Sequence, residues 1–160
     1  MNPPQFEQRA VTLGDREFLL RPLRAEDVDA LEACLDEPPV GATMTDSLLQ
    51  ILECEDPADS LALVAETDGA PVGTASLLFS AEEAWLYCVA VRPDMRNLGL
   101  GAAVVSRALE LARGRGVKRV CAHVRASNLA ARRAYEKAGL ASVGADGMRG
   151  EQLRYQVELA

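Results

Sequence analysis

The segment Arg96-Asn97-Leu98-Gly99-Leu100-Gly101-Ala102 carries more information about the fold than any other part of this chain. It follows an apolar run over 84–91 that is typical of a strand, and it begins a long amphipathic stretch over 99–115 that is typical of a helix. Glycines at such a junction permit a sharp turn and keep side chains away from a ligand. The first turn of a helix also presents unpaired N–H groups and partial positive charge. The junction therefore predicts a phosphate or pyrophosphate site.

Two standard nucleotide motifs do not match this turn. A P-loop needs Lys-Ser or Lys-Thr directly after its last glycine, and neither pair follows Gly101. A dinucleotide fingerprint needs a third glycine where this chain has Val104. Taken alone, the turn also fits a tight loop that merely begins a helix.

Composition favours a single folded domain over 1–160. The chain has 160 residues, of which 49% are hydrophobic, so it can build a core without disulfides or metals. Its net charge of −7 argues against nucleic-acid binding. The same charge suits either a cationic substrate or mere solubility.

Cysteine and histidine usage predicts no metal site. The four cysteines form no Cys-x-x-Cys pair, and the single histidine, His123, cannot complete a zinc cluster. Free thiols in a reducing compartment are the plain interpretation. Neither a signal peptide nor a run of 18 apolar residues is evident, so we expect a cytoplasmic chain without a membrane span.

The order of elements predicts an α/β fold. After a loose tail over 1–8, we expect a hairpin or bent strand over 11–21, helices over 25–35 and 45–53, and strands over 61–65, 71–79 and 84–91. A crossover helix over 99–115, a strand over 117–124, a helix over 128–138 and strands over 140–143 and 151–159 follow. The strand–helix–strand unit after the meander predicts a parallel pair within a mixed sheet.

Two motifs in this order resemble the GCN5-related N-acetyltransferase (GNAT) family. They are Val89-Ala90-Val91-x-Pro93-x-x-Arg96-x-x-Gly99-x-Gly101 and Asn128-x-x-Ala131-x-x-x-Tyr135-Glu136-Lys137-x-Gly139-Leu140, and the detailed match covers about residues 84–143. The resemblance implies a mixed sheet of six to seven strands with flanking helices and a splayed parallel pair. It also implies acetyl-CoA as the donor and direct transfer to an amine in a ternary complex.

The resemblance assigns the cofactor contacts by position. The backbone from Arg96 to Ala102 would bind the pyrophosphate, and Arg96 would add charge there. The strand backbone at Cys88, Val89, Ala90 and Val91 would pair with the pantetheine arm, and the neighbouring strand at 121–124 would splay away to admit it. Asn128 would contact the arm, and Tyr135 would reach the sulfur. Apart from the resemblance, the basic residues Arg132, Arg133 and Lys137 lie on the helix over 128–138. Arg132 or Arg133 could meet the 3′-phosphate, and a solvated helix face is the alternative.

Tyr135 suits the departure of the CoA thiolate. Amine attack on a thioester gives an anionic tetrahedral intermediate and then a thiolate, which a nearby phenol can protonate. The alternative is a core aromatic residue at helical spacing from Ala131 and Ala138. The motif favours the catalytic role.

The general base departs from the family pattern. Many members carry a glutamate on the fourth strand, where this chain has Trp85 and Tyr87, and acids appear only at Glu82 and Glu83 on the preceding turn. The segment 123–128 is similar to the ribosomal-protein N-terminal acetyltransferase branch, which has an acidic base at the position of His123. Imidazole titrates near neutral pH and keeps a base there. A histidine that only packs, and a water chain as base, stay open.

The acceptor and the partners stay open at this level. The amine belongs either to a protein N-terminus or lysine, or to a small molecule. Acidic stretches over 26–37 and 53–59 lie where the family forms its acceptor site. A non-catalytic acyl-CoA-binding regulatory module is the alternative function. Family members often pair through their C-terminal strands, so a homodimer is one expectation.

Overall fold

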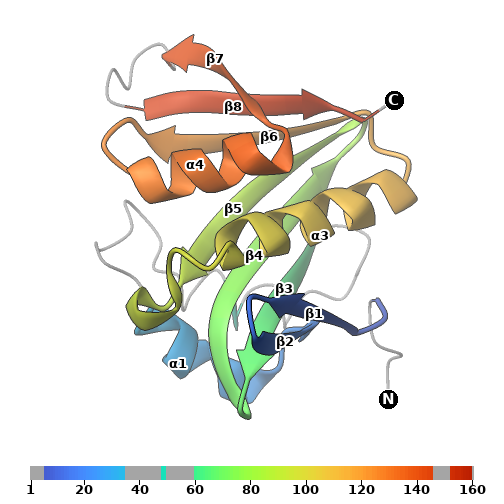
Figure 1. Cartoon of the computed structure of the whole chain (residues 1–160). Coiled ribbons are helices and arrows are strands. Elements are labelled where there is room, and N and C mark those ends of the chain that lie inside the picture. Colours follow the sequence, from blue (N-terminus) through green and yellow to red (C-terminus); the bar gives the residue numbers. More distant parts are fainter. Residues whose placement is uncertain (1–5, 35–47, 50–59, 146–151, 160) are drawn as a thin grey trace.

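The computed structural model describes residues 6–34, 48–49, 60–145 and 152–159. The strands within these residues form one sheet in the order β1-β2-β3-β4-β5-β6-β8-β7, and the β1–β2 hairpin and β7 lie at its opposite ends (Figure 1). The strands are β1 (Arg9–Leu13), β2 (Arg16–Pro22), β3 (Ser60–Thr67), β4 (Ala70–Ser80), β5 (Glu83–Val91), β6 (Arg119–Arg125), β7 (Ala141–Ala145) and β8 (Gln152–Glu158). The sheet therefore has eight strands where the resemblance implied six to seven. The N-terminal segment is a hairpin closed at Gly14, whose φ is +65°.

The helices agree with the sequence pattern where the structure describes them. A 3-10 turn (Ala25–Asp27) leads into α1 (Val28–Glu32), and α3 (Leu100–Gly114) and α4 (Leu129–Ala138) follow later. Gly139, with φ +106°, ends α4 as expected of a C-cap glycine. Of the helix expected over 45–53, only residues 48–49 lie within the described part, and both are helical.

Alternate residues of the central strands build a core on each face of the sheet. Leu61 and Leu63 belong to the larger core, beneath α3 and α4. Ala62 and Val64 point the other way and pack with Val28 of α1. This alternation follows from the two-residue period of a strand, and it gives the three-layer arrangement visible in Figure 1.

The parallel pair β5–β6 separates part of the way along its length. Glu83–Leu86 pair with Arg119–Ala122, and no pairing continues toward Val91 or Arg125. Figure 1 shows the two strands diverging from that point. The splay is confirmed, but it begins after Ala122 and not at Cys121 as the resemblance implied, since Cys121 still pairs with Trp85.

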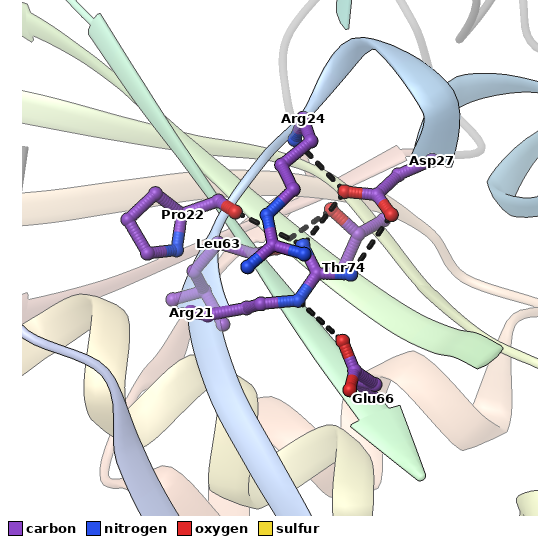
Figure 2. Close-up of polar contacts among 7 residues, drawn as sticks. All are labelled: Arg21, Pro22, Arg24, Asp27, Leu63, Glu66 and Thr74. Carbon is purple, nitrogen blue, oxygen red and sulfur yellow. Dashed lines mark hydrogen bonds and ion pairs between the residues drawn. The ribbon is translucent and has the colours of Figure 1, made fainter. Parts of the chain in front are cut away.

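A buried arginine attaches the start of α1 to the sheet. Arg21 of β2 donates two hydrogen bonds to the Asp27 carboxylate, at 2.8 and 2.9 Å, and its Nε donates to Glu66 at 2.6 Å (Figure 2). Its Nη1 also donates to the carbonyl of Pro22. Burial alone would raise the pKa of Asp27, but the hydrogen bonds from Arg21 and from the backbone of Arg24 lower it below its ordinary value. The buried charges are therefore paired on all sides, as burial requires.

The end of the predicted tail is anchored. Phe6 is buried in the larger core, beneath the guanidinium of Arg107 in α3. Arg107 also donates a hydrogen bond to the carbonyl of Glu7 at 3.2 Å. Residues 1–5 of that tail lie outside the described part.

Candidate active site

The two glycines of the turn have different structural roles. Gly99 is the N-cap of α3 with φ +89°, a left-handed conformation that L side chains rarely adopt. Gly101 lies inside the helix, where an added Cβ would come within 3.2 Å of the Ala134 Cβ in α4. Gly101 therefore permits close packing of α3 against α4. That role differs from the ligand clearance the sequence suggested for both glycines.

A lysine from a different helix lies over the glycine turn. The Nζ atom of Lys137 in α4 is 3.4 Å from the position that a Cβ would take on Gly99. The helix N-terminus already carries partial positive charge, so an ammonium there strengthens an anion site. Nothing in the sequence links Lys137 to the glycine turn, because local pattern does not say that α4 lies beside α3.

A bulge in β5 marks the open end of the strand pair. Ser76 of β4 faces Tyr87 and Thr74 faces Ala90, so Cys88 and Val89 together face one residue of β4. Cys88 adopts φ +52°. Bulges bend a strand and change the direction of its side chains and backbone groups, often beside active sites. The sequence carries no signal for this bulge, because cysteine does not favour that conformation.

Arg96 connects the turn to both faces of the sheet. Its Nε donates to the carbonyl of Val91 at the end of β5 at 3.0 Å, and its Nη2 donates to the carbonyl of Cys34 at 3.3 Å. The side chain therefore links the glycine turn to the segment that follows α1. Its predicted contact with the phosphates stays a prediction.

Tyr135 lies in the core beneath the splay. Its side chain is buried, and its ring meets that of Tyr155 edge to face at 5.8 Å. Burial raises the pKa of Tyr135 far above its ordinary value, and the neighbouring Cys88 adds to that effect. The phenol therefore remains protonated at neutral pH, beside the bulge residue whose backbone is the candidate pantetheine contact.

Two other residues that are predicted to contact the cofactor also make hydrogen bonds within the protein. Asn128 caps α4, since its Oδ1 accepts a hydrogen bond from the backbone N–H of Ala131 at 3.1 Å. Arg132 donates from Nη1 to the carbonyl of Ala126 at 2.9 Å and from Nε to the Tyr155 hydroxyl at 3.2 Å. Neither arrangement tests a contact with CoA, and both contacts stay predictions.

The base candidates lie at opposite ends of the β5–β6 pair. Glu83 is in the closed, paired end, and both Glu82 and Glu83 have cationic partners, Lys118 at 3.1 Å and Arg119 at 3.7 Å respectively. His123 is the first β6 residue beyond the paired stretch, and it is exposed on the sheet face away from α3 and α4. Its ring lies 4.8 Å from that of Trp85. His123 lies at the open end of the pair, so the geometry favours it over Glu82 and Glu83 as the candidate general base.

Within the ranges that the structure describes, no cluster of histidine, cysteine or acidic side chains is arranged to hold a metal ion. No described helix combines the length and apolar character needed to cross a membrane.

The chain belongs to a known family. The profile of the Acetyltransferase (GNAT) family matches residues 25–140, which is more than half of the sequence. This match, together with the splayed pair and the glycine turn, makes the chain a GNAT-family acetyltransferase domain.

Individual relatives extend this assignment. A mycothiol acetyltransferase of Cellulomonas flavigena is 32% identical over 162 residues, covering 92% of this chain and 44% of that protein. A putative [ribosomal protein bS18]-alanine N-acetyltransferase of Bacillus subtilis is 31% identical over 78 residues, covering 49% of this chain and 52% of that protein. The chain thus spans about half, or less, of the curated relatives it matches.

The fold has close structural relatives. The PaiA N-acetyltransferase of Thermoplasma acidophilum, solved in complex with coenzyme A, superimposes with a TM-score of 0.74. The match covers 88% of this chain and 98% of that one, at 18% identity. At that identity the likeness shows the fold.

Proposed function

We propose that this chain transfers an acetyl group from acetyl-CoA to a primary amine by direct attack. The observation that carries the proposal is the open end of the β5–β6 pair, with the turn at Gly99 and the buried Tyr135 side chain in support. The turn and Lys137 supply positive charge for a pyrophosphate. The unpaired edge of β5 supplies strand-like partners for the amides of the pantetheine arm.

The proton steps follow from the placement of His123 and Tyr135. The amine nitrogen forms a bond to the acetyl carbonyl carbon, and its proton passes to the imidazole of His123, directly or through a water. A backbone N–H of β5 stabilises the oxyanion. The C–S bond then breaks, and the thiolate takes the proton of the Tyr135 hydroxyl. A phenol carries its proton at neutral pH, so it has one to give to the thiolate.

Two acceptor classes fit the relatives. The likeness to a ribosomal-protein alanine N-acetyltransferase favours the free N-terminus of a protein, and the likeness to mycothiol acetyltransferases favours a small amine. The net charge of −7 suits a cationic acceptor of either class.

The first test is calorimetric binding of acetyl-CoA, with NADH and ATP as controls, followed by CoA release in the presence of an amine panel. The panel contains short peptides with a free N-terminal alanine, lysine peptides, amino acids and polyamines. Selective micromolar binding, the usual range for a cofactor-sized ligand, followed by turnover, supports the proposal. Tight binding without turnover on any amine favours the non-catalytic acyl-CoA module.

The role of Tyr135 is tested by Tyr135→Phe, with Tyr155→Phe as the matched control. The two rings are in contact, so both variants remove one hydroxyl from the same part of the core. We expect Tyr135→Phe to lower kcat on the order of 100-fold, the usual contribution of a general acid, without loss of acetyl-CoA affinity. Equal kcat values for the two variants would mean that Tyr135 only packs.

A further inference from the structure

Three side chains form a contact group on the sheet face away from α3 and α4. The rings of Trp85 and His123 are 4.8 Å apart with their planes at 46°, and the guanidinium of Arg154 lies over the Trp85 ring at 5.3 Å. His123 and Arg154 are cross-strand partners in β6 and β8. The group therefore joins three strands at one level of the sheet.

The group crosses the point where the strands part. Trp85 pairs in register with Cys121, inside the last stretch where β5 and β6 remain joined. His123 lies two residues further, just beyond that stretch. The indole therefore belongs to the paired side of this boundary, and the imidazole belongs to the first residue on the unpaired side.

We propose that Trp85 and Arg154 are positioning residues that hold the His123 ring at the mouth of the splay. This inference rests on the proposed function, in which His123 takes the proton of the amine. An exposed histidine side chain has several accessible rotamers, and a general base works only within hydrogen-bond reach of its proton. Contact with the indole restricts the imidazole, and Arg154 in turn restricts the indole.

Several charged or titratable side chains lie around the trio, among them Glu83 and Cys121. Arg125 is two residues from His123 along β6 and therefore on the same face. The Cys121 thiol lies 3.4 Å from the Glu83 carboxylate and 3.4 Å from Arg154, and Glu83 lies 3.9 Å from Arg154. Arg119 is also 3.7 Å from Glu83.

Composition provides a direct readout of this contact. The chain has one tryptophan and one histidine. Fluorescence of the tag-free protein, excited at the red edge of the indole band where tyrosine does not absorb, therefore reports Trp85 alone, and only one imidazole can affect it. A protonated imidazole in contact with an indole quenches its fluorescence. We expect the Trp85 fluorescence to fall on acidification in the wild-type protein and not in His123→Gln. A wild-type protein without that fall, or the same fall in His123→Gln, would overturn the contact.

Kinetics then test the positioning role. We expect Trp85→Leu to lower kcat by about tenfold or more, the scale of a misplaced catalytic group, and to alter the pH profile, with acetyl-CoA affinity unchanged. Trp85→Phe keeps an aromatic face and should recover most of the loss. Leu78→Ala is the control, because Leu78 faces Trp85 from β4 and is 48% exposed.

The outcomes separate this inference from the proposed function. If His123→Gln loses turnover and Trp85→Leu keeps the wild-type kcat and pH profile, the positioning role is wrong and the acetyl transfer stands. If the wild-type protein binds acetyl-CoA but transfers acetyl to no amine, the proposed function fails and the positioning role fails with it. Equal losses in Trp85→Leu and Leu78→Ala would reduce Trp85 to a packing residue.

Discussion

Arg21 and Arg154 show two different uses of a cation on one sheet. The Arg21 side chain is 3% exposed and binds two carboxylates at 2.6 to 2.9 Å. The Arg154 side chain is 35% exposed, lies 3.9 Å from its carboxylate partner and rests on an indole ring. Its Nε is buried without a hydrogen-bond partner in the described structure. Arg21 has its partners inside the fold, whereas Arg154 is held by weaker contacts beside the candidate base.

The difference indicates which region maintains the fold and which serves the chemistry. A buried charge must be fully paired, because an uncompensated charge in the core is very costly. A partly exposed charge on an aromatic face adds little stability. The Arg21 cluster therefore maintains the position of α1, whereas the Trp85–His123–Arg154 group is the one that we propose for the site.

The largest expected effect is on stability, from Arg21→Met. The variant leaves Asp27 and Glu66 without their cation in the core, and we expect a loss of about 3–5 kcal/mol in the free energy of unfolding. Urea denaturation measures it. Arg16→Met is the control on the same strand, because Arg16 is exposed and 3.7 Å from Asp68, and we expect it to cost less than about 1 kcal/mol. Similar losses in both variants would contradict the distinction.

The second effect is the pH dependence of the stability that Asp27 contributes through its pairing with Arg21. The folded pKa of Asp27 is lowered, so its contribution to stability is present above the unfolded value, about 3.9, and is lost as pH falls through the folded pKa. We expect the free energy of unfolding to fall with acidification below about pH 4 and to fall less steeply in Asp27→Asn. Arg16→Met should keep the wild-type slope. A slope unchanged in Asp27→Asn would show that Asp27 titrates alike in the folded and unfolded chain.

The third effect is on acetyl-CoA affinity, because the proposed partner of the Lys137 ammonium is the pyrophosphate of that ligand. Lys137→Gln removes the ammonium beside Gly99, and we expect acetyl-CoA binding to weaken about tenfold, the scale of one charge-assisted hydrogen bond. Calorimetry with acetyl-pantetheine, which lacks the pyrophosphate, should show no such change. Arg113→Gln, at the far end of α3, is the control. Equal weakening for both ligands would place Lys137 away from the pyrophosphate.

The smallest effect is on stability, from Arg154→Met. The loss of a partly exposed cation–π contact should cost about 0.5–1 kcal/mol, well below the cost of Arg21→Met. The same urea titration measures it. A cost as large as that of Arg21→Met would show that Arg154 stabilises the fold as much as Arg21 does. It would contradict the distinction between the two arginines.

Much of the fold could be predicted because its signals are local. The turn at Gly99, the helix ending at Gly139 and the strand alternation around Leu63 depend on residues close together in sequence, and the structure agrees with each. The parallel crossover followed from the order of its elements. Motif spacing then indicated the family, which the match over 25–140 confirms.

The features that were missed depend on contacts between distant segments. Gly101 is needed because α4 packs on α3, and Lys137 reaches the turn for the same reason. The bulge at Cys88 arises from its pairing with β4, in a residue that does not favour its conformation. Local propensity carries no information on any of these.

The sequence by itself determined the class of fold, the family and the position of the glycine turn, because glycine placement and hydrophobic period act over a few residues. Only the tertiary structure decided where β5 and β6 part, and which candidate base stands at that opening. It also decided that Trp85 and Arg154 lie against His123. Those facts depend on strand register, which brings together residues from β5, β6 and β8 that are far apart along the chain.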